Sequence, residues 1–360
     1  MTNRNAAFPV LCFAIPFLLL HCSGNAPADR KYPFSHLGGA YLGQKEPGNK
    51  PELFAPDIVS TGLYERDFAM TPEGDEIYYC TVTGNYTYAT ILTSRLKNGR
   101  WTRPEVAPFA AGTDYITIEP HVSPDGRRFF FMSDRPDPSG TGRTEKNEDI
   151  WVMDRTEEGW SEPYNLGPPV NSEHAEYFPS VAKSGTMYFT RRLKDGSDEA
   201  IYRSKLVNGR YQTPERLPPA VNAGRMRFNA CVDPDERFLV IPVFGLPDSR
   251  GATDYYISYR DDHDVWTGPV HMGDLVNSEA RTEYSPYITA DGKYMFFTTD
   301  RVEKPADIHA LSVRALKAWH NSPGNGYPDI WWVSTSFIAS LIPQGKQVGL
   351  PPAGEGNSFP

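Results

Sequence analysis

Acidic side chains recur at equivalent places in this chain, and carboxylates gathered together can hold a cation or transfer a proton. The places are set by a turn of the Pro-Asp-Gly type, which recurs at residues 74, 126, 185, 236 and 292. Nine residues before these turns stand Glu65, Thr117, Glu176, Arg227 and Glu283. Seven residues before them stand Asp67, Glu119, Phe178, Asn229 and Ser285, and five before them stand Ala69, His121, Ser180, Cys231 and Tyr287. Because alternate residues of a strand share one face, we expect these sets to line one channel.

The mouth of such a channel would be acidic, with Arg227 facing five carboxylates, those of Glu65, Asp67, Glu119, Glu176 and Glu283. Carboxylates this close raise one another's pKa or recruit a cation. An all-oxygen ring suits a hard cation such as calcium, and it would equally suit a cationic peptide or an ammonium group. The alternative is structural: the acids cap strand starts and pair with nearby arginines, namely Arg66, Arg225, Arg227 and Arg281.

Other signals of chemistry are few. His121 and His174 are expected near the same mouth as rim residues, because no His-x-x-x-His or similar spacing supports a metal site. The chain has no Gly-x-Ser-x-Gly elbow, phosphate loop or dinucleotide fingerprint. A Ser/His/Asp triad stays open, since its members are distant in sequence. We therefore assign no catalytic residue and no metal ligand. The formal net charge of −9 argues against a nucleic-acid partner, which needs a basic stripe.

The repeat predicts the elements that position these residues. An extended segment leads into each turn, an aromatic strand such as Phe129–Phe131 follows it, and a third strand opens with Asp149, Asp254 or Asp329 in three copies. An aromatic-x-x-Pro segment comes last, beginning at Trp101, Trp160, Tyr211 or Trp266. Proline cannot donate to a strand ladder, so this segment should be the outer edge of a four-stranded blade. A repeat of 51–59 residues built from strands predicts an all-β propeller.

The number of blades follows from how the ring closes. The last repeat lacks the edge segment after Trp332, but residues 53–60, ahead of the first repeat, resemble the missing tail. We expect this N-terminal strand to complete the last blade, because closure removes exposed edges. The prediction is five blades over residues 51–335, with a sixth, degenerate blade as the alternative.

The Asp-Gly turns, the Asp149-Ile150-Trp151 strand and the Trp-x-x-Pro edges together resemble the TolB-type, WD-repeat-like propeller proteins of bacterial envelopes. The resemblance covers about residues 51–335. It implies the fold and a place in the cell envelope. It implies little about activity, because members of such a superfold do many things.

The N-terminus predicts export. Arg4 precedes an apolar run over residues 6–20, which is too short for a comfortable membrane span. Leu19-Leu20-His21-Cys22 resembles the bacterial lipoprotein box, apart from His21, so Cys22 is the expected lipidation site. Cleavage after residues 26–28 is the alternative. Residues 1–22 are thus an export signal, 23–50 a tether, and 336–360 a short terminal helix and tail. Cys80 and Cys231 are expected to be separate buried thiols.

These features predict an exported, lipid-anchored propeller in the periplasm or at the outer membrane. We expect it to bind an envelope protein or a glycan as a scaffold module, with the N-terminal lipid as its contact with the membrane. The alternative is a carbohydrate-active enzyme that uses the carboxylates at the channel mouth. A third hypothesis, a propeller that gates a peptidase, would need a separate partner chain.

Overall fold

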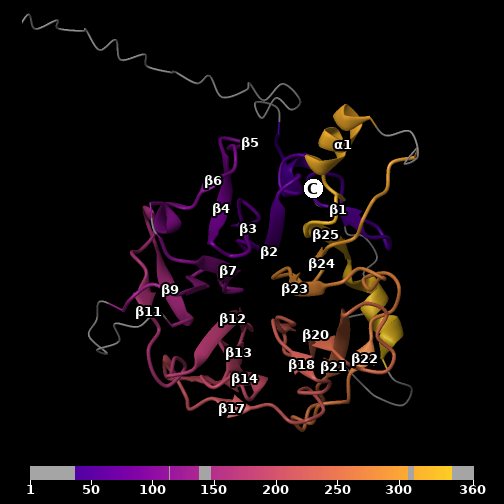
Figure 1. Ribbon diagram of the computed structural model, residues 1–360. Helices are drawn as coiled ribbons and strands as arrows, with labels where there is room; N and C mark the ends of the chain where they lie inside the picture. Colours follow the sequence, from indigo (N-terminus) through magenta and orange to yellow (C-terminus); the bar gives the residue numbers. More distant parts are fainter. Residues whose placement is uncertain (1–36, 113, 138–146, 307–311, 343–360) are drawn as a thin grey trace, which may run out of the picture. The chain divides into compact units, whose positions relative to one another are not determined.

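Five antiparallel β-sheets surround a common centre in the computed structural model (Figure 1). The structure describes residues 37–112, 114–137, 147–306 and 312–342. The expected export signal, Cys22 and the first half of the expected tether lie outside these ranges. The sheets form a five-bladed propeller, as predicted, and a sixth blade is not found in the described residues. No helix among the described residues is long and apolar enough to cross a membrane.

The blades follow one another along the chain. The first blade contains β2 (Tyr64–Met70), β3 (Glu76–Thr83), β4 (Tyr88–Lys97), β5 (Arg100–Trp101) and β6 (Glu105–Val106). The second contains β7 (Thr117–Val122), β8 (Arg128–Ser133), β9 (Asp149–Thr156), β10 (Gly159–Trp160) and β11 (Tyr164–Asn165). The third contains β12 (Ala175–Val181), β13 (Met187–Arg192), β14 (Glu199–Ser204) and β17 (Glu215–Arg216), beside a small hairpin of β15 (Leu206–Val207) and β16 (Arg210–Tyr211).

The last two blades complete the ring. The fourth contains β18 (Met226–Arg227), β19 (Cys231–Val232), β20 (Phe238–Phe244), β21 (Thr253–Tyr259) and β22 (Val270–His271). The fifth contains β23 (Glu283–Ile288), β24 (Tyr294–Thr299), β25 (Asp329–Ser334) and β1 (Glu52–Leu53). The helices are short: α1 (Val313–His320) and the 3₁₀ turns Ala40–Gly43, Pro108–Ala110 and Thr335–Leu341.

The N-terminal strand closes the ring as predicted. Leu53 of β1 pairs with Trp331 of β25, and Phe54 N–H donates to the Ile330 carbonyl at 2.9 Å. The Ser60 hydroxyl donates to the same carbonyl and accepts from Ile330 N–H. Phe54 is fully buried and packs edge-on against Phe68, Phe296 and Trp332. The closure is therefore both hydrogen-bonded and hydrophobic.

The predicted outer strand is present, but it is split at its proline. In the first blade Trp101 pairs with the end of β4, and β6 pairs with β4 again after the break at Pro104. An asparagine that recurs after the outer segment forms hydrogen bonds with the third strand of its blade. The Asn171 amide bonds both backbone groups of Ile150, and Asn222 and Asn277 do the same for their own blades. The asparagine side chain thus pairs the backbone N–H near the start of the third strand, and it adds a second hydrogen bond to a carbonyl that the outer segment already reaches.

The innermost strand of every blade contains a bulge at the same place. The residue seven before the turn has a left-handed φ of 50–61° in all five blades, namely Asp67, Glu119, Phe178, Asn229 and Ser285. The pairing register shifts there in four of the strands, and the fourth blade's inner strand is interrupted there between β18 and β19. The freed N–H groups reach the preceding blade, where they donate to Cys80 Sγ, Glu119 Oε2 and Thr190 Oγ1. The bulges thus join neighbouring blades at the centre of the ring.

The two cysteines of the folded part behave as expected. Cys80 and Cys231 are buried free thiols on different blades. Burial raises the pKa of both thiols, that of Cys231 to about 12. They are therefore inert at neutral pH.

Candidate functional site

A cavity of about 370 Å³ lies where the inner strands of all five blades converge. We call it the mouth cavity. Five of its residues stand eight before the turns: Arg66, Ile118, Tyr177, Phe228 and Tyr284. Three stand ten before the turns: Tyr64, Ile116 and Thr282. The rest are Tyr86, Glu119, Met132, Glu148, Arg192 and Asn229.

These positions differ from the expected ones by one residue. The positions expected from the sequence stand nine, seven and five before the turn, whereas the cavity is lined mainly at eight and ten before it, with Glu119 and Asn229 from the set seven before. In a strand, a shift of one residue turns every side chain to the opposite face. The bulge seven residues before the turn also breaks the alternation of side chains between the two faces. A position counted back from the turn therefore does not give the correct face at the start of the strand.

The acids nine before the turn hold the loop that leads into their own strand. Glu176 accepts from the Ser172 N–H at 2.9 Å and from Arg191 Nε at 2.7 Å. Glu65 accepts in the same way from the Thr61 N–H and hydroxyl, and Glu283 accepts from the Ser278 hydroxyl. None of the three lines the mouth cavity. Their bonds match the structural alternative, in which acids cap strand starts.

Burial raises the pKa of these same carboxyls. It raises the pKa of Glu65 to about 8, against the lowering effect of the Thr61 hydrogen bonds. It raises the pKa of Glu283 to about 7, and it also raises that of Glu176. Asp329, whose charge adds to the effect at Glu65, has a pKa raised to about 7 by burial. Protonated carboxyls are thus part of the folded state near neutral pH.

A belt of hydrogen-bonded groups joins the five blades at the mouth cavity. Arg66 Nη2 donates to Glu119 Oε1 at 3.1 Å and to the Ser285 hydroxyl at 3.2 Å. Asn229 Nδ2 donates to the same hydroxyl at 3.0 Å, and Phe178 N–H donates to Glu119 Oε2 at 2.8 Å. Asp67 lies 2.7 Å from Arg66 Nε. Every blade contributes to this belt, so buried hydrogen bonds connect the inner strands across the centre of the ring.

The Arg66–Glu119 pair is deeply buried. Burial raises the pKa of the Glu119 carboxyl, and the Arg66 guanidinium and the Phe178 N–H act in the opposite direction. The Arg66 guanidinium also lies 4.8 Å from the ring centre of Tyr284 and 5.8 Å from that of Tyr86. A cation over two aromatic faces, with two carboxylates beside it, is held in one place.

The remaining expected site residues lie outside the mouth cavity. His121 Nε2 accepts from the Val181 N–H of the next blade at 2.9 Å, and burial lowers its pKa to about 4, so the ring is neutral. Arg227 pairs with Asp198 at 3.0 Å. No group of three or more His, Cys, Asp or Glu residues suited to a metal ion occurs in the described ranges. The acids considered for calcium are tied instead to separate loops and arginines.

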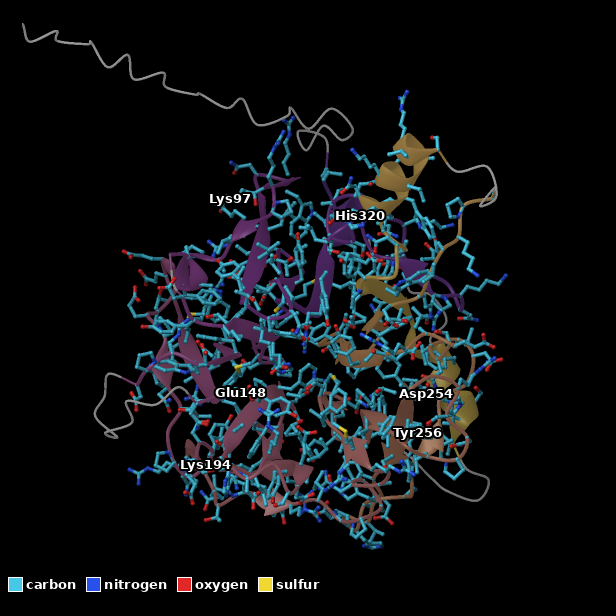
Figure 2. All side chains as sticks on the ribbon, viewed as in Figure 1. Lys97, Glu148, Lys194, Asp254, Tyr256 and His320 are labelled. Carbon is cyan, nitrogen blue, oxygen red and sulfur yellow. The ribbon has the colours of Figure 1, made fainter. Side chains whose placement is uncertain are left out.

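Several residues of the cavity were not expected from the sequence. Arg192 Nη2 pairs with Glu148 at 2.7 Å, and its guanidinium lies 5.7 Å from the Tyr177 ring centre. Glu148 lies between the second and third sheets, where its carbonyl accepts from the Glu176 N–H (Figure 2). Burial raises the pKa of Glu148. The aromatic residues Tyr177, Phe228 and Tyr284 did carry a signal, since all three stand eight before a turn.

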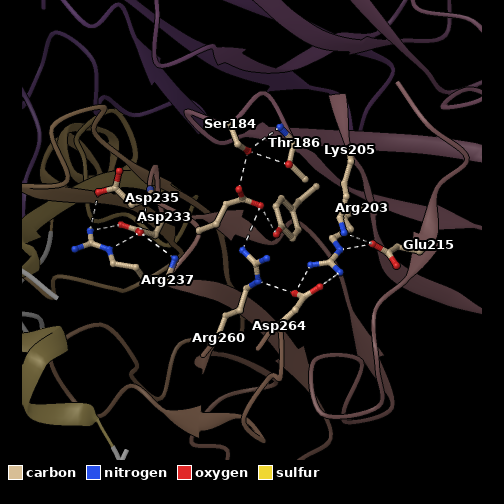
Figure 3. A network of polar contacts seen from close by, with 12 residues as sticks. Ser184, Thr186, Arg203, Lys205, Glu215, Asp233, Asp235, Arg237, Arg260 and Asp264 are labelled. Carbon is tan, nitrogen blue, oxygen red and sulfur yellow. Dashed lines mark hydrogen bonds and ion pairs between the residues drawn. The ribbon is translucent and has the colours of Figure 1, made fainter. Parts of the chain in front are cut away.

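A second polar cluster joins the third and fourth blades away from the mouth cavity (Figure 3). Arg203 is buried and contacts Glu215 and Asp264, while Arg260 Nε donates to Asp264 at 2.6 Å. Hydrogen bonds from Arg203 hold the pKa of Asp264 well below its usual range. Since the buried arginine and these carboxylates satisfy one another, the cluster is a clamp between blades.

Comparison with known proteins finds no match in sequence, but it finds likenesses among solved structures. No protein-family model matches the sequence, and no curated protein sequence matches it. Among solved structures, TolB from Acinetobacter baumannii is 14% identical over 76% of this chain and 54% of TolB, with a TM-score of 0.41. The chain thus spans about half the length of TolB. An arabinanase from Bacillus subtilis is 14% identical over 80% and 99% of the two chains, with a TM-score of 0.45. A GH62 hydrolase in complex with xylotriose is 8% identical over 79% and 96%, also with a TM-score of 0.45. The likeness extends to the fold alone.

Proposed function

We propose that this chain is an exported propeller, anchored by lipid at Cys22, that binds a glycan or a protein segment of the cell envelope in the mouth cavity. One observation carries the proposal: five aromatic rings and two arginines converge there from the blades. A concave site with aromatic walls and a few directed polar groups is the usual form of a ligand pocket. The envelope location rests on the predicted signal and lipoprotein box.

The state of the carboxylates favours binding over catalysis. Glu119 is bonded to Arg66 and to the Phe178 N–H, and Glu148 is paired with Arg192. A general acid or nucleophile must instead reach the reacting atoms with its carboxyl group. Since both acids of the cavity are engaged with arginines, their role in holding those arginines accounts for their presence.

A binding screen tests the proposal. The exported protein, purified from detergent extracts after expression of the full chain, is screened against immobilised glycans, peptidoglycan fragments and solubilised envelope proteins. The Arg192→Ala variant should weaken a specific interaction about tenfold, because it removes an exposed donor of the cavity. The matched control is Arg216→Ala, which removes an exposed arginine paired with Asp198 outside the cavity. A screen without a specific ligand, or equal binding by the two variants, would contradict the proposal.

The second candidate is a carbohydrate-active enzyme. The observation that favours it is that Glu119 and Glu148 line one cavity and that burial raises the pKa of both. Paired carboxyls of this kind perform glycoside hydrolysis. Incubation with oligosaccharides separates the two candidates. Release of reducing sugar that is lost in both Glu119→Gln and Glu148→Gln would establish the enzyme, whereas retained ligand without turnover fits the binding module.

A further inference from the structure

Buried hydrogen bonds connect all five blades at the mouth cavity. The belt runs across the ring from Asn229 through Ser285 and Arg66 to Glu119 and the Phe178 N–H. These five residues are at most 8% exposed. Further links between blades are made by His121 with Val181 N–H, and by Tyr287 with the Met70 carbonyl. A polymer cannot pass through the ring, so a bound chain must present an end.

The arginines of the cavity are already compensated by carboxyls, since Arg66 also lies against Asp67, which is outside the lining. The lining contains two guanidinium groups, Arg66 and Arg192, and two carboxyls, Glu119 and Glu148. Each arginine lies against one of these acids, at 3.1 and 2.7 Å. A ligand with a net charge would have to disrupt one of these pairs and leave its partner uncompensated. The lining therefore favours an uncharged ligand.

One buried acceptor in the cavity has no partner. Asn229 is 2% exposed and lines the cavity. Its Nδ2 donates to Ser285, but its Oδ1 has no hydrogen-bond partner within the described ranges. A buried amide oxygen left unpaired is costly, so a ligand that donates to it gains more than an average hydrogen bond. The ligand should therefore carry a hydroxyl or another neutral donor.

A half-buried aromatic ring, Phe228, lines the cavity next to this acceptor in the sequence. The Tyr86 and Tyr284 faces are covered by the Arg66 guanidinium, and Arg192 lies over Tyr177. Phe228 is half-buried, lines the cavity and stacks on no other ring within the described residues. Sugars combine hydroxyl groups with an apolar face of C–H bonds, which suits an aromatic ring beside hydrogen-bonding groups. The cavity volume of about 370 Å³ is near the lower end of the range of roughly 300–1,000 Å³ for small-molecule sites, so it holds few sugar rings.

From these observations we infer that the mouth cavity binds the terminal sugar of an uncharged glycan. The sugar ring lies against Phe228, and one of its hydroxyls donates to Asn229 Oδ1. The inference rests on the proposed function, because it names the ligand of that same cavity. Binding of the sugar through these two contacts requires no proton transfer.

The experiment uses defined neutral oligosaccharides of glucose, galactose, xylose, arabinose and N-acetylglucosamine, from one to six units, titrated into the exported protein by calorimetry. At least one series should bind. Its affinity should rise over the first units and then level off, because the closed cavity reaches only the chain end. Uronic-acid oligosaccharides and charged tripeptides form the comparison sets.

Two pairs of variants test the contacts. Asn229→Gly removes the acceptor and accommodates the φ of +50°, whereas Asn229→Ser keeps a neutral acceptor oxygen at a bulge position where Ser285 of the fifth blade has a φ of 53°. Phe228→Leu removes the ring, whereas Phe228→Tyr keeps it. The first member of each pair should weaken binding about tenfold, and the second should restore most of it. Thermal melting checks that all four are folded.

The outcomes separate the inference from the proposed function. If charged peptides or uronates bind, neutral sugars do not, and Arg192→Ala weakens that binding, the inference is overturned and the proposed function stands. If a neutral sugar binds equally well to all four variants, it lies elsewhere and the inference is overturned. If no glycan, peptide or envelope protein binds, both are overturned.

Discussion

Arg66 Nη2 donates to Glu119 Oε1 across the first and second blades at 3.1 Å, and both side chains are less than 8% exposed. Asp67 lies 2.7 Å from the same guanidinium. One cation therefore compensates two buried carboxyls at the centre of the ring, where five inner strands meet. Because Arg66 and Glu119 both line the mouth cavity, this arrangement links the stability of the ring to the cavity.

Replacing Arg66 by Met should be among the costliest single changes. It leaves Asp67 and Glu119 buried without their cation, and loss of one partner from a buried pair costs about 3–5 kcal/mol of the free energy of unfolding. Denaturant unfolding followed by fluorescence measures this. Arg192→Met is the matched control, because its side chain is 44% exposed and an exposed pair contributes about 0–1 kcal/mol. Equal losses in the two variants would mean that the buried pair is not a main support of the ring.

The closure of the ring gives a second prediction. Phe54→Ala removes a fully buried ring that contacts Phe68, Phe296 and Trp332, and such a truncation costs about 3–5 kcal/mol. Because Phe54 adjoins the strand that completes the last blade, the variant should also be cleaved sooner by proteases in residues 52–60. Val313→Ala, at a 70% exposed position, should change the free energy of unfolding by less than about 0.5 kcal/mol. A small loss for Phe54→Ala would contradict the assigned role of the N-terminal strand.

Some elements of the fold could be predicted from the sequence, whereas the residues that line the cavity could not. The turns, the Trp101-type edge segment and the closing segment at Leu53 were predictable, because strand period and proline chemistry act locally. The cavity positions were not. Tyr177, Phe228 and Tyr284 recur once per repeat. The face of the strand on which they lie changes with a shift of one residue, and the bulge in each strand introduces such a shift. Glu148 and Arg192 form an ion pair although they are 44 residues apart in the sequence, so no local pattern predicts their contact.

Lipidation of Cys22 stays a prediction of the sequence, and a direct experiment tests it. The protein produced from the full chain in a bacterial host should incorporate a labelled fatty acid and fractionate with membranes. Cys22→Ser should lose the label and appear in the soluble envelope fraction. Cys80→Ser is the control, since Cys80 is buried in the first blade and should keep both properties. A Cys22→Ser protein that stays labelled and membrane-bound would contradict the lipid anchor.

The pH dependence of stability gives the last prediction, and its sign follows from Glu65. The pKa of Glu65 is raised by burial from 4.5 to about 8 in the folded chain. The folded state therefore keeps a proton that the unfolded state loses between these values, and the free energy of unfolding must fall as pH rises from 4.5 to 8. The pKa values of Glu283 and Asp329, raised to about 7, act in the same direction.

Glu65→Gln cannot ionise, so the melting temperature of this variant should fall less between pH 5 and pH 8.5 than that of the unsubstituted protein. It should not become independent of pH, because Glu283 and Asp329 still titrate. Glu105→Gln, on the exposed strand β6, controls for a general effect of removing one negative charge. Differential scanning calorimetry at both pH values measures the difference. If the melting temperature falls equally between the two pH values in Glu65→Gln and in Glu105→Gln, the Glu65 carboxyl is ionised in the folded chain.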